Sequence, residues 1–217
     1  MTKIFDEIEK FKNWAETYSD IPQDERDGEW ECDYSDWPII WTEFEDFLND
    51  SHYSNWTDEE INNVLYIIAR DNETNSIIEL ISERPKTFEF IAKAGLSFNS
   101  LDTKWQIVEK LYKIENKSDT ELLVEKYLKQ DIEYVSRMAI KTLGRLKSNL
   151  TEKYCEKAWE WNKNDPMSEY QRMMALTVLF EFGSPLTSKY IKLAKEDGRE
   201  YLVRQAINIE NKAGNTV

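Results

Sequence analysis

Apolar residues recur at helical spacing along almost the whole chain. The clearest face consists of six residues at positions i, i+3, i+4, i+7, i+8 and i+11: Val135, Met138, Ala139, Thr142, Leu143 and Leu146. This spacing is typical of one side of an amphipathic helix. Glycine (6) and proline (5) are scarce, and no segment alternates convincingly between apolar and polar residues. The pattern therefore predicts an all-α protein.

Start and stop signals divide residues 57 to 212 into helices of roughly 8 to 17 residues. Thr57 with Glu60, and Ser118 with Glu121, have the spacing of a capping box. Ser184 supplies a cap donor before Pro185, and proline is tolerated at the first position of a helix. The predicted boundaries lie near Asn72, Pro85, Asn99, Lys117, Gln130, Asn149, Pro166, Ser184 and Gly198.

A repeated motif lies within these helices. Val135, Arg137, Ala139, Leu143 and Gly144 stand where the second helix of a HEAT repeat usually carries Val, Arg, Ala, Leu and Gly. Similar motifs follow at 171–179 and 202–206, and their alanines, Ala139, Ala175 and Ala206, are 36 and 31 residues apart. The chain thus resembles the HEAT/armadillo family, well over residues 119–212, weakly over 57–117, and not at all before that.

The resemblance implies an α-solenoid of HEAT-like helical hairpins over residues 57–217, in which a small residue lets paired helices approach closely. Two departures stand in the second unit: Gln171 replaces the usual Val, and no glycine follows Leu179. The family pattern also implies structural ion pairs for the arginines of these motifs. Arg137, Arg172 and Arg204 would pair with Asp131, Asp165 and Asp197.

Charge is distributed unevenly along the chain. Residues 1–60 hold 19 acidic and 4 basic side chains, whereas residues 61–217 hold 23 and 24, within a net charge of −14. Five of the eight tryptophans lie in the same 60 residues. A disordered acidic tail would be poor in aromatic residues, so we expect residues 1–56 to form an irregular, acidic, Trp-rich helical segment. Most of its tryptophans should pack internally, with one or two exposed.

This charge excludes several classes of partner. An acidic chain without a basic stripe is repelled by nucleic acids and by anionic lipid surfaces. The apolar stretches, such as 64–69, are far shorter than the ~20 residues that span a membrane, and the acidic N-terminus lacks the apolar region of a signal peptide. We expect a cytoplasmic protein with reduced thiols at Cys32 and Cys155, without a cofactor.

Catalytic patterns are sparse. The chain has one histidine, His52, and neither a phosphate-binding glycine loop nor a zinc-protease or hydrolase motif. Carboxylates beside tryptophans are similar to the acid and base of glycoside hydrolases, several of which are helical toroids. The candidates here are Asp24, Glu29, Asp33 and Asp36. The chain is short for such a toroid, however. The carboxylates between Asp20 and Asp36 lack EF-hand spacing, so a metal site is not expected.

Solenoids of this kind mainly bind proteins. Carboxylates steer a basic partner and buried aromatic residues hold it. By analogy, the chain resembles the immunity proteins of contact-dependent growth inhibition and polymorphic toxin systems, whose toxins are often basic nucleases. The resemblance implies a monomer that is not an enzyme and that neutralises a basic toxin in a 1:1 complex. The expected partner-binding residues are Asp27, Glu29, Trp30, Glu31, Asp33, Tyr34, Asp36, Trp37 and Trp41.

Two alternatives remain open. A HEAT-type adaptor of a host protein complex would use its helical faces rather than the acidic segment. A small carbohydrate-active or lyase-like enzyme would use the cluster of tryptophans and carboxylates, and a small ligand would then quench tryptophan fluorescence.

Overall fold

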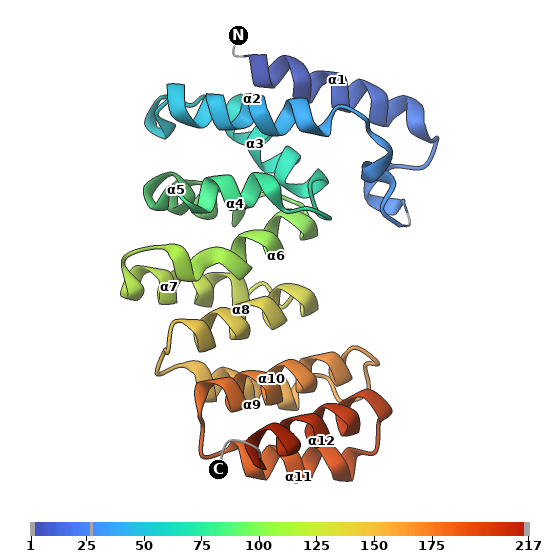
Figure 1. Ribbon diagram of the computed structural model, residues 1–217, viewed down its shortest axis with the longest axis vertical. Helices are drawn as coiled ribbons and strands as arrows, with labels where there is room; N and C mark the ends of the chain where they lie inside the picture. The colour runs from blue at the N-terminus through green and yellow to red at the C-terminus, as the bar shows by residue number, and fades with distance from the viewer. Residues whose placement is uncertain (1–2, 27, 215–217) are drawn as a thin grey trace. The chain divides into compact units, whose positions relative to one another are not determined.

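The computed structural model describes residues 3–26 and 28–214, and every regular element in them is helical (Figure 1). The prediction of an all-α protein is therefore confirmed. The chain divides into two compact units, Met1–Ile107 and Val108–Val217. Within the described residues, no helix combines the length and the apolar character needed to cross a membrane.

The first unit contains most of the irregular structure. Its elements are α1 (Lys3–Tyr18), η1 (Gln23–Glu25), η2 (Trp30–Asp33), α2 (Trp37–Asp50), η3 (Tyr53–Asn55), α3 (Asp58–Arg70), α4 (Ser76–Ser82), α5 (Pro85–Gly95) and the start of α6 (Leu101–Lys110). Helix α1 packs on α2 and α3, and α2 also packs on α4. The predicted N-terminal segment, residues 1–56, is thus one part of a larger packed unit.

Local signals place the helix ends of this unit. The capping box is present, because the Thr57 hydroxyl accepts from the Glu60 backbone N–H and the Glu60 carboxylate accepts from the Thr57 N–H. Pro38 and Pro85 lie in the first turns of α2 and α5. Backbone N–H groups in the first turn of a helix make no intrahelical hydrogen bond, so a proline, which lacks this group, removes none there. Local chemistry therefore sets these starts, as predicted for the helices that begin after Thr57 and at Pro85.

The second unit consists of η4 (Leu111–Lys113), α7 (Lys117–Leu128), α8 (Glu133–Arg145), α9 (Thr151–Glu160), α10 (Ser168–Phe182), α11 (Thr187–Asp197) and α12 (Glu200–Gly214). Successive helices pack on each other, and α8, α10 and α12 also pack in series (Figure 1). The predicted capping box at Ser118 is wrong. The Asn116 side chain caps α7 by accepting from the N–H groups of Ser118 and Asp119.

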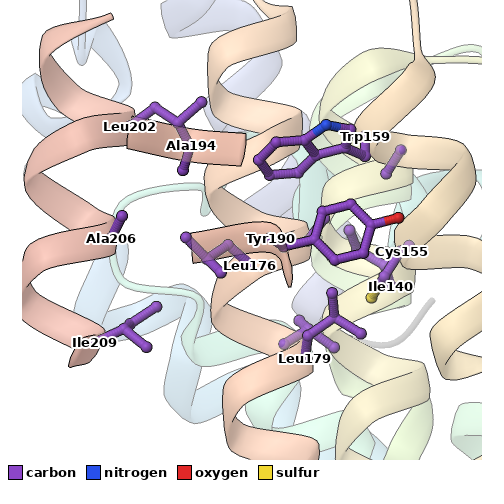
Figure 2. Packing of buried hydrophobic residues seen from close by; sticks show 13 residues of the cluster. Ile140, Cys155, Trp159, Leu176, Leu179, Tyr190, Ala194, Leu202, Ala206 and Ile209 are labelled. Carbon is purple, nitrogen blue, oxygen red and sulfur yellow. The ribbon is translucent and has the colours of Figure 1, made fainter. Parts of the chain in front are cut away.

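The core of the second unit is continuous between its helices. Figure 2 shows the Tyr190 ring beside that of Trp159, and Leu202, Ala206 and Ile209 on α12. The centroids of the Tyr190 and Trp159 rings are 4.8 Å apart. Close approach needs small residues here. A Cβ on Gly144 would lie 2.7 Å from Val178 Cγ1 of the neighbouring helix α10, so this glycine is required by packing.

Polar side chains link alternate helices, α6 to α8, α8 to α10 and α10 to α12. The Thr142 hydroxyl donates to the Val108 carbonyl at 2.7 Å, and the Gln171 amide donates to the Glu133 carbonyl at 2.8 Å. The Gln205 amide donates to the Thr177 hydroxyl at 2.8 Å. Gln171 thus acts as a hydrogen-bond donor between α10 and α8.

The ion pairs implied for the motif arginines are wrong in detail. Arg137 pairs with Glu133 at 2.8 Å instead of Asp131, and it lies over the ring of Tyr170. Arg172 pairs with Asp197. Asp131 and Asp165 are used locally instead. Asp131 accepts from the indole N–H of Trp161, and Asp165 accepts from the backbone N–H of Met167. Arg204 lies over the ring of Tyr201, 5.1 Å from its centroid.

Candidate functional site

A single arginine holds the connection between α1 and α2. Arg26 Nε donates to the Ile21 carbonyl at 2.8 Å, and its Nη2 donates to the carbonyls of Ala15 and Ser19 at 2.8 and 3.0 Å. The carbonyls of Ala15 and Ser19 lie in the last turn of α1 and directly after it, where the helix supplies no intrahelical partners, and Ile21 lies in the connection that follows. The guanidinium also lies 4.4 Å from the ring centroid of Trp30. Arg26 thereby fixes the segment that carries the candidate residues.

Aromatic rings form the core beneath this segment. The ring of Phe11, which is fully buried, lies with its centroid 5.0–6.2 Å from the centroids of five others: Trp14, Trp30, Tyr34, Trp37 and Tyr66. Trp30, Trp37 and Trp56 are buried, whereas Trp14 and Trp41 are half-buried. Most of the five tryptophans pack internally, as expected, but none is exposed.

Burial changes the interpretation of four predicted partner-binding residues. Trp30, Tyr34 and Trp37 are 6–7% exposed and belong to the aromatic core. Glu31 is only 3% exposed, and its Oε1 accepts from Arg70 Nη1 at 3.2 Å. The helical turn η2 directs Glu31 inward, so these four side chains are not part of an exposed binding surface.

The electrostatics of Glu31 are dominated by its burial. Removal from water raises the pKa of its carboxyl above the ordinary value of 4.5, while Arg70 lowers this pKa and Asp102 raises it further. The nearby guanidinium therefore compensates only part of the cost of burying the carboxylate.

The other predicted residues lie at or near the surface. Glu29 and Asp33 are exposed, and Asp36 and Trp41 are half-buried. Asp33 accepts from the Tyr18 hydroxyl, and Trp41 Nε1 donates to Asp71 Oδ1 at 3.3 Å. Asp27 lies outside the described residues.

Cys32 lies among these carboxylates. Its thiol has a pKa above the ordinary value, first because of desolvation and then because of the negative charges of Glu73, Glu29, Glu31 and Asp33. Such surroundings disfavour a reactive thiolate. The other thiol, Cys155, is buried, and burial raises its pKa to about 12.

Sequence reasoning missed three residues that complete the site, Arg70, Asp71 and Glu73. Asp71 is 3% exposed, and its Oδ2 accepts from the Ile77 N–H at 2.7 Å, at the start of α4. Burial raises its pKa. All three lie about 40 residues from the acidic segment along the chain, so no local pattern indicated them.

Two cavities are lined by both Glu31 and Arg70. The larger, about 480 Å³, is also lined by Arg26, Trp30, Asn72 and Asp102. The smaller, about 220 Å³, is also lined by Cys32, Trp37, Trp41 and Asp71. The aromatic core forms one wall of each cavity.

The described residues contain no group of three or more His, Cys, Asp or Glu side chains placed to hold a metal ion. Of the four residues considered as a glycosidase acid and base, Glu29 and Asp33 are exposed and Asp36 is half-buried; the side chain of Asp24 is not among those described. The imidazole of His52 interacts with its neighbours Ser54 and Tyr53.

Comparison with known proteins gives no relative: no protein-family model matches the chain, and no curated protein or solved structure is significantly similar to it. Inferences about function therefore depend on the residues described above.

Proposed function

We propose that this chain is a protein-binding protein whose acidic first unit takes up a basic partner. In its most specific form the proposal is an immunity protein that neutralises a basic, nuclease-like toxin in a 1:1 complex. The observation that carries it is the distribution of exposed carboxylates, because the surrounding residues supply few cations to balance them.

The exposed acidic residues of the first 60 positions are numerous. They are Asp6, Glu9, Glu16, Asp20, Glu25, Glu29, Asp33, Glu45, Asp46, Asp50, Asp58 and Glu59. Only 4 basic side chains occur in the same stretch, and Arg26 is directed to backbone carbonyls. An electrostatic field of one sign raises the rate at which an oppositely charged protein associates.

Two exposed apolar side chains supply anchors in place of the buried tryptophans. Tyr18 is 40% exposed and Ile21 is 52% exposed. Tyr18 is hydrogen-bonded to Asp33, and Ile21 follows the exposed Asp20. An aromatic anchor surrounded by charged groups is a common arrangement at protein interfaces. We therefore place the contact surface at Tyr18, Asp20, Ile21, Glu29 and Asp33.

The proposal includes a HEAT-like solenoid. Its support is the series of helix-to-helix hydrogen bonds at sequence separations of 34 and 38 residues, from Thr142 to Val108 and from Gln171 to Glu133. These separations match the length of a two-helix unit. The glycine at the α8–α10 contact, Gly144, gives further support.

The test is affinity capture of the tagged chain from its native cells, with and without Asp20→Lys/Asp33→Lys. The matched control is Glu115→Lys/Glu181→Lys, which reverses two exposed carboxylates of the second unit. We expect one basic protein to be captured by the wild type and by the control, and to be lost in the first variant. Co-expression should then protect cells from that protein.

A partner that is captured equally by all three proteins would contradict the acidic contact surface. A partner whose capture depends on Asp20 and Asp33, but which does not harm cells, would support the binding of a basic protein and exclude the immunity role.

An adaptor function is the second candidate, and one observation favours it. Tyr170 and Tyr201 are 38% and 46% exposed on α10 and α12, and Arg137 and Arg204 lie over their rings. This Tyr/Arg row of the second unit could contact a protein. Capture that is abolished by Tyr170→Ala/Tyr201→Ala, but not by the acidic reversal, would support the adaptor.

A further inference from the structure

The larger cavity of the first unit contains polar atoms whose hydrogen-bonding capacity is unused. Arg26 Nη1, Glu31 Oε2 and Asn72 Oδ1 are buried and have no hydrogen-bond partner within the described residues. All three side chains line the same cavity of about 480 Å³. Buried polar atoms are nearly always paired, so their gathering in one cavity indicates a ligand that pairs them.

The charges around the cavity are balanced. Two guanidinium groups, Arg26 and Arg70, face two carboxylates, Glu31 and Asp102. Attraction and repulsion by these four groups offset each other for a ligand of either sign, so a charged ligand gains little Coulomb energy to compensate for its own desolvation. The lining therefore favours a neutral ligand.

The unused atoms define the hydrogen bonds that such a ligand must make. One of them is a donor, Arg26 Nη1, and two are acceptors, Glu31 Oε2 and Asn72 Oδ1. A primary carboxamide has two N–H donors and one carbonyl acceptor. We propose that this cavity binds a neutral primary carboxamide, whose NH₂ group donates to Glu31 and Asn72 and whose carbonyl accepts from Arg26.

Two of these atoms are held in place before any ligand arrives. Arg26 is fixed by its three hydrogen bonds to the carbonyls of Ile21, Ala15 and Ser19. Glu31 is fixed by the hydrogen bond from Arg70 to its other oxygen. Such preorganisation reduces the entropy lost on binding.

Sugars also offer hydroxyl donors and acceptors, but they usually stack on an exposed aromatic face. The only tryptophan that lines this cavity within the described residues is Trp30. Arg26 lies over its ring at 4.4 Å, and Trp14 is stacked with it at a centroid distance of 5.8 Å. Trp30 therefore offers no free platform, which favours the carboxamide.

The experiment is calorimetric titration of the whole chain with matched pairs of probes. Nicotinamide represents a free small amide, and N-acetyl-glutamine N-methylamide represents a peptide side chain. Their acid counterparts are nicotinate and N-acetyl-glutamate N-methylamide, and glucose is the sugar control. We expect at least one amide to bind at least tenfold more tightly than its acid, and the preferred amide identifies the source of the ligand.

The diagnostic variant is Asn72→Ala, because the Asn72 side chain makes no described hydrogen bond whose loss would unfold the protein. It should weaken amide binding about tenfold and leave the melting temperature unchanged. The control Asn208→Ala, at an exposed position of the second unit, should change neither amide binding nor the melting temperature. The proposal is overturned if no amide binds, if acids or glucose bind equally well, or if Asn72→Ala has no effect. It is independent of the basic partner, because Asn72 is not part of the acidic contact surface.

Discussion

Burial and pairing shift the pKa values of carboxylates in the two units in opposite directions. In the first unit, Glu31 and Asp71 are buried, and the loss of water raises the pKa of both. In the second unit, Asp197 has a lowered pKa, because Arg199 and then Arg172 stabilise its charge. Asp197 of the second unit is thus compensated by two guanidinium groups, whereas the single guanidinium near Glu31 compensates that carboxylate only in part, beside two cavities.

This difference in compensation between Glu31 and Asp197 indicates which part of the molecule is more suited to binding. A carboxylate that is paired as Asp197 is contributes to stability. Incompletely paired groups beside a cavity reduce stability and are usually retained where a site binds something. The following changes test this contrast, from the largest expected effect to the smallest.

Replacing Phe11 by alanine should destabilise the first unit most. The ring is fully buried and contacts five other aromatic rings, and loss of a buried phenylalanine costs about 3–5 kcal/mol. Urea unfolding followed by tryptophan fluorescence measures the loss. Leu176→Ala is the counterpart in the second unit, at about 2–5 kcal/mol. A cost below about 1 kcal/mol for Phe11→Ala would show that the aromatic cluster is not the core of its unit.

The Glu31–Arg70 pair should respond asymmetrically. Arg70→Met leaves a buried carboxylate without its guanidinium and should cost about 3–5 kcal/mol at neutral pH. Glu31→Gln should cost under about 1 kcal/mol there, because the raised pKa shows that the fold favours the neutral side chain. The double variant should be more stable than Arg70→Met alone in a double-mutant cycle.

The pH dependence gives the control for this pair. An acid whose folded pKa is raised destabilises the fold as pH rises above its unfolded value, here 4.5. Wild-type stability should therefore decline relative to Glu31→Gln above pH 4.5. Equal losses for the two single variants at neutral pH would contradict the asymmetry.

Gly144→Ala should test the close helix contact of the second unit. The added Cβ meets Val178 Cγ1 at 2.7 Å, and overpacking of this kind costs about 1–3 kcal/mol. Val178→Ala removes the obstructing methyl group. The double variant should therefore lose less stability than the sum of its two single changes, and strict additivity of the melting measurements would be evidence against the contact.

Asp197→Asn should give the smallest effect and the clearest contrast with Glu31. A lowered folded pKa stabilises the protein above the ordinary value of 3.8, and this contribution is lost as pH falls through the folded pKa. The variant should be less stable than the wild type at neutral pH, and the two should converge in acid. Thermal melts across this range provide the measurement; a constant difference would exclude the proposed ion pairs.

Much of the fold was predictable because its signals are local. The capping box at Thr57 and the proline-marked start of α5 follow from residues within a few positions of each other. The concentration of tryptophan correctly indicated a packed aromatic cluster. The start of α7 near Lys117 was predicted, but its cap was assigned to Ser118, whereas Asn116 caps the helix.

The candidate site was predictable only in part. The acidic segment was identified, and Glu29 and Asp33 are exposed as expected. The inward direction of Glu31 was missed, because it depends on the short helical turn η2 and on Arg70, 39 residues away. Asn72 and Asp102 do not belong to any sequence motif that indicates a site. Only the fold of the first unit brings them to the cavity.

By itself, the sequence determined the helices, their ends and the excess of negative charge near the N-terminus, since these follow from spacing, capping chemistry and composition. The tertiary structure alone decided which carboxylates and aromatic rings face water and which polar atoms share a cavity. The physical reason is that burial and pairing depend on contacts between residues far apart in the chain, and in the first unit those contacts turned Glu31, Trp30 and Trp37 away from the surface.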